Sequence, residues 1–232
     1  MDILAQMQGP EFWIGLLKII WINIILSGDN AVVIAMAART LPPEQQRKAI
    51  FWGTAAAVIL RVALTAVAAK LLEQPYLQIV GGLLLLWIGV QLLSDDDGGE
   101  GEEKHHGNLF SAIRTILIAD LVMSLDNVIG VAAAANGNIT LLVIGLAIAI
   151  PIVIFGSTMM IKLMERFPVI VTLGAGLIGW VAGEAIVSDK VLRGSFPEHS
   201  LQFYLAAAVG AAFVIAVGKF LQRRNALNAP AA

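Results

Sequence analysis

Residues 12–38 read FWIGLLKIIWINIILSGDNAVVIAMAA, an almost unbroken apolar stretch that contains one Asp-Asn pair. A bilayer core needs about 20 consecutive, mainly apolar residues for each helix that crosses it. This stretch is longer than that. Its apolar residues also run in a block, whereas a soluble helix carries them as a stripe on one face. The stretch therefore predicts a transmembrane helix with a carboxylate, Asp29, inside it.

The rest of the chain has the same character. Of its 232 residues, 58% are hydrophobic and 14% are charged, whereas about a quarter of the residues in soluble domains are charged. The absence of cysteine excludes disulfides and thiolate metal ligands. The first ten residues lack the basic start and cleavage site of a removable signal peptide. We therefore predict an all-α membrane protein, with residues 1–232 in a single membrane domain and seven transmembrane helices at 12–38, 49–72, 75–93, 109–135, 139–162, 168–187 and 201–220.

Basic residues gather on one side of these seven helices. Ten lie in the connections and tail of one side and three on the other: Arg39, Arg47, Lys48, Lys104, Arg114, Lys162, Arg166, Lys219, Arg223 and Arg224 against Lys70, Lys190 and Arg193. Short loops rich in Lys and Arg stay in the cytoplasm. We therefore expect the N-terminus outside and the C-terminus in the cytoplasm.

The chain also contains an internal repeat. Ser27-Gly28-Asp29-Asn30 recurs 97 positions later as Ser124-Leu125-Asp126-Asn127. Other landmarks recur in the same order: Lys70-Leu71-Leu72-Glu73 as Lys162-Leu163-Met164-Glu165, and Pro75, Gly81 and Trp87 as Pro168, Gly174 and Trp180. The pattern predicts two repeats, residues 12–93 and 109–187, with residues 201–220 as an added seventh helix. Because each repeat has three helices, the two have opposite orientations, as in many secondary transporters.

The segment between the repeats, residues 94–108, reads SDDDGGEGEEKHHGN. This acidic, glycine-rich composition is typical of a flexible, solvated linker. A second reading is a cytoplasmic antenna in which His105, His106 and the acidic residues collect divalent cations. We favour the tether, because adjacent histidines bind a metal weakly without a fixed third ligand.

Two aspartates inside the apolar helices mark a candidate site. An intramembrane carboxylate is costly and is by default a functional-site candidate, and both Asp29 and Asp126 lie well inside their stretches. Polar residues recur beside each at i, i+4 and i+7, on one helix face: Asn23, Ser27 and Asn30 in the first motif, and Asp120, Ser124 and Asn127 in the second. Gly28 weakens its helix, so that a turn could unwind there and free carbonyl oxygens for a cation. For Ser27 and Ser124 alone, we favour plain interhelical hydrogen bonding.

The donors in this set are all oxygens. Carboxylate, amide and hydroxyl oxygens suit Mg²⁺, Ca²⁺ and Mn²⁺, whereas zinc and copper prefer imidazole or thiolate. Two or three carboxylates, from Asp29, Asp126 and Asp120, would neutralise one divalent ion in a low dielectric. We therefore predict a hard divalent cation as the transported substrate, without a prosthetic group. Sodium or protons stay open as substrate or as coupling ion.

Two further charged residues lie in predicted helices. Arg61, midway along residues 49–72, requires a partner, for which one of the aspartates is the candidate. It could hold the empty site neutral until substrate displaces it, or form a purely structural ion pair. Glu184 aligns with Gln91 at the offset of 93 and could be an outer ligand or a proton carrier. It also lies near a helix end, where a long side chain reaches water easily.

The segments SGDNAVVIAMAAR and SLDNVIGVAAAA, the paired three-helix repeats, the acidic linker and the seventh helix together resemble the TerC family, most closely its short bacterial YjbE-like branch. The resemblance covers about residues 12–220. It implies membership of the LysE-type exporter superfamily, a place in the bacterial cytoplasmic (inner) membrane and, for several relatives, manganese efflux. The motif residues that carry over are Asp29, Asn30, Asp126 and Asn127. Asn23, where the second motif has Asp120, makes the halves unequal.

These observations favour a secondary transporter that exports a divalent cation, with Mn²⁺ implied by the resemblance. We expect no enzymatic activity and no nucleic-acid partner, and the chain has no Walker motif for ATP hydrolysis. Two alternatives stay open: an exporter of a small organic cation or amino acid, and a non-transporting membrane partner that helps to metallate or assemble other proteins. An intramembrane aspartyl protease is disfavoured, because its Tyr-Asp and Gly-x-Gly-Asp motifs are absent. The oligomeric state is left open.

Overall fold

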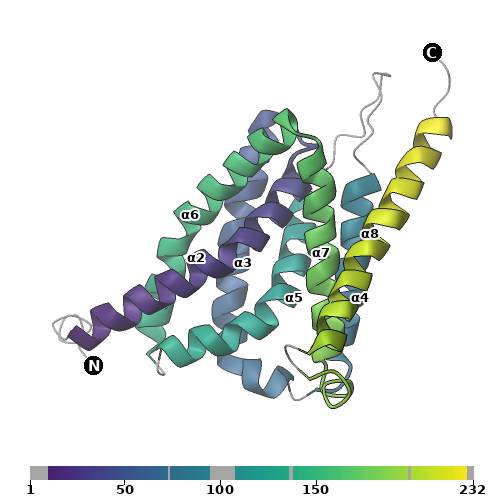
Figure 1. The fold of residues 1–232 in the computed structure, drawn as a ribbon. Helices are drawn as coiled ribbons and strands as arrows, with labels where there is room; N and C mark the ends of the chain where they lie inside the picture. The colour runs from purple at the N-terminus through teal and green to yellow at the C-terminus, as the bar shows by residue number, and fades with distance from the viewer. Residues whose placement is uncertain (1–9, 73, 95–107, 136–137, 198–199, 229–232) are drawn as a thin grey trace.

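The computed structural model describes residues 10–72, 74–94, 108–135, 138–197 and 200–228. Their backbone forms the following α-helices (Figure 1): α2 (Pro10–Ala38), α3 (Pro43–Leu72), α4 (Leu77–Ser94), α5 (Leu109–Ala135), α6 (Ile139–Arg166), α7 (Val169–Ser188) and α8 (Leu201–Asn228). No strand occurs in these ranges, which confirms the predicted all-α class for the described part of the chain. Most of the linker, including His105 and His106, lies outside that part, and its role stays a prediction.

Predicted and observed helices agree in position and differ mainly at polar ends. Helix α5 has the predicted bounds, whereas α3 begins at Pro43 instead of Ala49, and α8 ends at Asn228 instead of Phe220. Hydropathy marks only the apolar length of a helix, whereas its backbone hydrogen bonds continue into water. A proline at the start of α3 suits the first helical position, where no intrahelical N–H bond is needed.

Among the residues that the structure describes, five helices contain stretches long and apolar enough to cross a membrane: Pro43–Thr65, Leu77–Ser94, Thr140–Arg166, Val169–Ser188 and Leu201–Asn225. Within α2, the described side chains give two shorter apolar stretches, Phe12–Ile22 and Gly28–Ala38. A multi-pass membrane protein is therefore confirmed. The count of seven spans, the division into repeats and the orientation of the termini stay predictions.

Helix α2 is continuous through Gly28, so the expectation of an unwound turn there is wrong. A glycine costs a helix about 1 kcal/mol relative to alanine, whereas each unbonded backbone group inside a bilayer costs several kcal/mol. Keeping the helix is therefore the more favourable outcome. Gly28 faces open space, since a Cβ placed there would meet no heavy atom within 4 Å.

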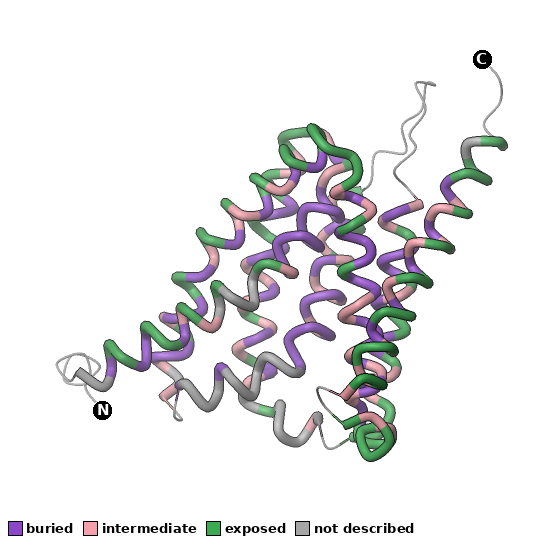
Figure 2. Tube along the Cα trace, in the orientation of Figure 1, coloured by how far each residue is buried: buried purple, intermediate pink, exposed green. Residues whose placement is uncertain are grey.

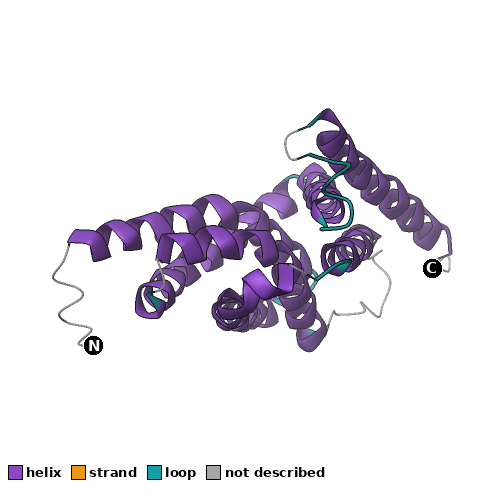
Figure 3. Cartoon of the chain, turned by 90° about the horizontal axis from the view of Figure 1, so that it is seen from below, coloured by secondary structure: helices purple, strands orange, loops and turns teal. Residues whose placement is uncertain are grey.

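The helices pack as two groups. In the first group α2 lies along α6 and α3 along α5, and α2 also contacts α5. In the second group α4, α7 and α8 pack against one another, with α8 at the edge of the bundle (Figure 1). The view from below (Figure 3) shows only helices and their connecting loops among the described segments.

Two helix pairs of the first group have matching contacts. A Cβ placed on Gly53 of α3 would stand 2.8 Å from Cδ1 of Ile116 in α5, and one on Gly145 of α6 would stand 2.4 Å from Cγ2 of Ile19 in α2. The two glycines are 92 positions apart (145 − 53) and the two isoleucines 97 (116 − 19). These offsets are those that relate Lys70 to Lys162 and the two Asp-Asn motifs. Corresponding residues therefore meet in the pairs α3–α5 and α6–α2.

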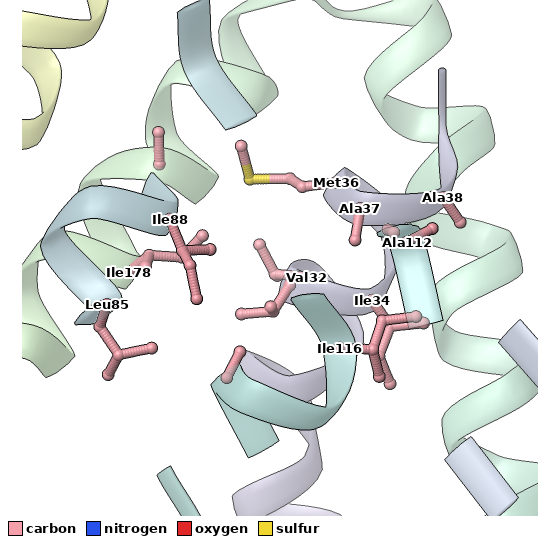
Figure 4. Close-up of a cluster of buried hydrophobic side chains, with 14 of the residues drawn as sticks. Val32, Ile34, Met36, Ala37, Ala38, Leu85, Ile88, Ala112, Ile116 and Ile178 are labelled. Carbon is pink, nitrogen blue, oxygen red and sulfur yellow. The ribbon is translucent and has the colours of Figure 1, made fainter. Parts of the chain in front are cut away.

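The buried residues, coloured along the chain in Figure 2, include one large hydrophobic core, one smaller core and a third cluster around Leu64. The large core takes residues from every described helix, including Met36 of α2, Leu85 of α4 and Ile178 of α7 (Figure 4). The smaller core, at the end of the bundle where α2 begins, consists of Phe12, Leu16, Ile19, Val131, Ala135, Leu141, Leu142 and Leu146. All eight come from α2, α5 and α6. The two groups thus share a core at one end, while the first group has the smaller core to itself.

Small residues bring α7 and α8 into backbone contact. A Cβ on Gly179 would stand 2.5 Å from the carbonyl oxygen of Gly210, and one on Gly183 2.5 Å from that of Ala206. Glycines four residues apart are a common device for close packing of transmembrane helices. At the positions 93 residues earlier, α4 has Leu86 and Val90. The sequences of α4 and α7 therefore differ at the positions where α7 contacts α8.

Candidate functional site

A buried ion pair joins α3 to α5. The Arg61 guanidinium donates through Nη2 to Oδ1 of Asp120, and its Nε donates to the Ser124 hydroxyl over 2.9 Å. That hydroxyl in turn donates to Oδ2 of Asp120 over 3.1 Å. All three side chains are buried, and the two on α5 share a face because they are four residues apart. The prediction that Arg61 pairs with an intramembrane aspartate is confirmed.

Such a cluster is costly to break. Removing one partner of a buried ion pair typically costs about 3–5 kcal/mol, because the other charge is left uncompensated. Replacing both partners with well-packed apolar groups is often neutral or stabilising. The presence of the Arg61–Asp120 ion pair is therefore weak evidence that these residues stabilise the fold.

Asp29 lies half-buried on α2, beside this cluster. Its Oδ1 accepts a hydrogen bond of 2.8 Å from the backbone N–H of Asn30, and the Asn30 side chain is itself buried. Among the described side chains, none forms an ion pair with Asp29. Helix α2, which carries this carboxylate, packs against both α3 and α5, the two helices that the ion pair joins.

Four predicted site residues have side chains outside the described part: Asn23, Ser27, Asp126 and Asn127. Their backbones belong to α2 and α5, which pack against each other. Among the described side chains, no group of three or more His, Asp or Glu residues is placed to hold a metal ion. A ligand set around Asp29 and Asp126 therefore stays a prediction.

Glu184 has a partner on its own helix. Trp180 Nε1 donates to Glu184 Oε1 over 2.7 Å, and the Trp180 ring lies 6.4 Å from that of Tyr204 in α8. No described hydrogen bond or ion pair connects Glu184 to Asp29 or Asp120. Its role as an outer ligand or proton carrier stays a prediction.

Helix α6 carries the uncharged counterpart of the ion pair. Thr65 donates its hydroxyl to the carbonyl oxygen of Arg61 over 2.7 Å, and Ser157 donates to that of Val153 over 2.8 Å. Ser157 lies 92 positions after Thr65 (157 − 65), and Val153 lies 92 positions after Arg61 (153 − 61). In α6, Val153 therefore occupies the position that Arg61 has in α3. On the facing helices Asn23 takes the place of Asp120. Val153 was not predicted from the sequence, although extending the Lys70–Lys162 alignment by nine residues reaches it.

Asp189, a residue the sequence analysis did not single out, caps α4 from the loop after α7. It accepts hydrogen bonds from the backbone N–H groups of Tyr76 (3.1 Å), Gln78 (3.1 Å) and Val191 (2.9 Å). Burial raises the pKa of this carboxyl, but backbone N–H groups, that of Ile79 included, outweigh it and leave the pKa below its ordinary value. The bonds also hold Tyr76 at a φ of 67°, a left-handed conformation that non-glycine residues rarely adopt. No local pattern in the sequence indicates a cap supplied from so far along the chain.

Comparison with known proteins places these features in a family. The model of the "Integral membrane protein TerC family" matches residues 8–226. The "Uncharacterized membrane protein YjbE" of Bacillus subtilis is 44% identical over 213 residues, which cover 92% of this chain and 97% of that protein. No solved structure matches the chain.

Two Escherichia coli relatives are more distant. The "UPF0053 inner membrane protein YoaE" is 27% identical over 94% of this chain, which spans 45% of that longer protein. The "UPF0053 inner membrane protein YgdQ" is 24% identical over 97% of this chain and 99% of its own length. Both relatives are thus named as inner membrane proteins.

Proposed function

Because the chain belongs to the TerC family of integral membrane proteins, we propose that it is a secondary transporter that exports a divalent metal cation from the cytoplasm. The proposed ligands are the motif residues Asp29 and Asn30 of α2 and Asp126 and Asn127 of α5. Mn²⁺ is the proposed substrate. The proposed location of the protein is the bacterial cytoplasmic membrane, with its N-terminus outside.

The observation that carries this proposal is the position of Asp29. It lies on a mainly apolar helix, half-buried, with no described ion-pair partner. An ionised carboxylate in such a place requires a compensating cation. The packing of α2 against α5 supports Asp126 as the second carboxylate. A mobile cation between the two helices would compensate both.

The donor chemistry favours a hard divalent cation, and the choice of manganese rests on the family resemblance. Carboxylate and amide oxygens suit Mg²⁺, Ca²⁺ and Mn²⁺. Mg²⁺ gives up its water reluctantly, and Ca²⁺ takes about 6–8 oxygen ligands. These side chains therefore fit a hard divalent cation, and the family resemblance favours Mn²⁺ among the three.

Inverted repeats and alternating access are part of the proposal. If α2, α3 and α4 are exchanged with α5, α6 and α7, in that order, the main helix contacts are preserved. The contact α2–α6 becomes α5–α3, and the contacts α2–α5 and α4–α7 each become themselves. The matched Gly–Ile contacts, Gly53 with Ile116 and Gly145 with Ile19, support the same exchange.

One contact departs from this symmetry. A Cβ on Gly174 of α7 would stand 2.9 Å from Val32, which is three residues after Asp29, whereas one on Gly81 of α4 would stand 2.8 Å from Val122, four residues before Asp126. The registers thus differ by seven residues, or about 10 Å along a helix. With the N-terminus outside, Val32 and Val122 both lie on the cytoplasmic side of the aspartate in their helix, so α7 and α4 close the protein on that side. If the two helices exchanged their registers, the contacts would lie on the outer side of the aspartates and the protein would be closed there instead.

The direct test is divalent cation flux into proteoliposomes that contain the purified full-length chain. We expect wild type to transport Mn²⁺ in preference to Mg²⁺ and Ca²⁺. Asp29→Asn with Asp126→Asn should lower the rate by at least about 100-fold, since the remaining amide ligands carry no negative charge to offset ion dehydration. Glu165→Gln is the matched control, because it removes an exposed carboxylate at the end of α6 and should leave the rate unchanged. Undiminished flux in the double variant would refute the site assignment.

Two alternatives predict different results. A small organic cation or an amino acid, which the proposed LysE-type kinship would suggest, requires efflux of that solute and no metal movement. A partner that only helps to metallate or assemble other proteins requires no flux of any solute by the pure protein. Coupling to protons or sodium is tested by collapsing each gradient in turn and measuring the rate of Mn²⁺ transport.

A further inference from the structure

We propose that Arg61 sets the charge selectivity of the transport site by withdrawing Asp120 from the ligands. This inference rests on the proposed function of Asp29 and Asp126 and deepens it. The sequence analysis counted Asp120 as a third carboxylate for the metal. The structure instead gives it a fixed cation on the neighbouring helix.

The first support is that both oxygens of Asp120 are engaged. Oδ1 accepts from Arg61 and Oδ2 from the Ser124 hydroxyl, which also accepts from Arg61 Nε. All three groups are buried. A metal that used Asp120 or Ser124 would have to break this closed set of hydrogen bonds. The same argument removes Ser124 from the predicted ligands.

The second support is the charge balance. Three aspartates, at positions 29, 120 and 126, contribute −3, and Arg61 contributes +1, so that the sum is −2. One divalent cation neutralises this sum. Without Arg61 the sum would be −3, which fits a trivalent cation. Charge mismatches are expensive in a low dielectric, and α2, which carries Asp29, packs against both α3 and α5.

The third support is the other helix pair. Where α3 and α5 have Arg61 and Asp120, α6 and α2 have Val153 and Asn23. The pair α3–α5 thus has both the arginine and the aspartate, whereas the pair α6–α2 has neither. The glycine–isoleucine contact is the same in both pairs, so a neutral combination is compatible with this packing.

The test compares four full-length proteins in proteoliposomes: wild type, Arg61→Val, Asp120→Asn, and the double variant that copies the neutral pair. We expect Mn²⁺ transport in the double variant to stay within about threefold of wild type, because its charge sum is also −2. Each single variant should lose at least about tenfold, because its charge sum is −3 or −1. La³⁺ is the second probe. Its potency as an inhibitor, relative to Mn²⁺ affinity, should rise at least about tenfold in Arg61→Val only.

The possible results separate this inference from the proposed function. If wild type moves Mn²⁺ but the double variant is as inactive as Asp120→Asn, Asp120 is a ligand and the inference is wrong. An unchanged La³⁺ preference in Arg61→Val would show that Arg61 has only a structural role. If wild type moves no divalent cation at all, the proposed function itself fails. Since a single variant can misfold, the active double variant is the decisive sample, with monodispersity in detergent as its check.

Discussion

The helix pairs α3–α5 and α6–α2 share their packing and differ in their charge. In each pair a glycine lies against an isoleucine, Gly53 with Ile116 and Gly145 with Ile19. In each pair a hydroxyl also bonds to the carbonyl four residues earlier. The first pair nevertheless holds a buried Arg–Asp bridge, whereas the second has Val153 at the place of the arginine.

The difference distinguishes residues that are needed for helix packing from residues whose charge serves the proposed metal site. Because the α6–α2 pair packs without an ion pair among its described side chains, the charges of Arg61 and Asp120 are not required for two such helices to associate. Burying them costs desolvation that an apolar pair avoids. The charged residues are therefore best explained by the site beside them, whereas the shared glycines and isoleucines explain the packing.

The largest expected effect on stability is at the charged pair. Arg61→Ala leaves Asp120 uncompensated and should lower the free energy of unfolding by about 3–5 kcal/mol. Val153→Ala, its counterpart in α6, removes two buried carbon atoms and should cost about 1–2 kcal/mol. Denaturant titration of both variants in the same mixed micelles measures the difference. Equal losses at the two positions would contradict the comparison.

The contact of α7 with α8 should be the next most sensitive. Gly179→Ala places a methyl group against the backbone of Gly210 and Ala211, which no side-chain rotation can relieve. We expect a loss of about 1–3 kcal/mol or more in the same unfolding assay. The control is Gly28→Ala, where the added methyl meets open space. It should instead stabilise α2 by up to about 1 kcal/mol.

The two matched glycines should differ slightly. A methyl group at Gly145 would come 2.4 Å from Cγ2 and 3.0 Å from Cβ of Ile19, whereas one at Gly53 would chiefly meet the terminal Cδ1 of Ile116 at 2.8 Å. A terminal methyl can rotate away, whereas atoms next to the backbone cannot. Gly145→Ala should therefore cost about 1–3 kcal/mol and Gly53→Ala less. The reverse order in unfolding midpoints would mean that the pairs are packed differently.

The smallest effect concerns the start of α4, which Asp189 caps, whereas α7 begins without a side-chain cap. The pKa of Asp189 is lowered in the folded protein. Its contribution to stability is therefore fully present above the unfolded pKa of about 3.9 and is lost as the pH falls through the lower folded pKa. Unfolding midpoints measured between about pH 2.5 and 6 should fall more steeply on acidification for wild type than for Asp189→Asn. Parallel profiles would exclude this cap as the cause.

Hydropathy predicted the helices because the bilayer imposes one simple demand, a long apolar stretch, on each of them. It could not place the start of α3 or the end of α8, where the outermost turns are polar. It also allowed the wrong expectation at Gly28, since the local propensity of one glycine is outweighed by the cost of unbonded backbone in lipid.

The sequence predicted the site only in part. Asp29 and the need of Arg61 for an acidic partner both followed from the cost of charge in an apolar helix. The choice of Asp120 did not, because it depends on the register between α3 and α5, which the periodicity of either helix alone does not contain. The Asp189 cap could not be predicted either, because its partners at the start of α4, Tyr76 and Gln78, lie more than 100 residues away.

The central claim is that Asp29 and Asp126 hold one divalent cation while Arg61 and Asp120 neutralise each other. The most direct measurement is equilibrium binding of Mn²⁺ to the purified protein, followed by the loss of the free-ion electron paramagnetic resonance signal. We predict one Mn²⁺ per chain in wild type and in Arg61→Val with Asp120→Asn, and none in Asp29→Asn with Asp126→Asn. Binding that survives loss of the motif aspartates, or that disappears with the Arg61–Asp120 pair, would contradict the claim.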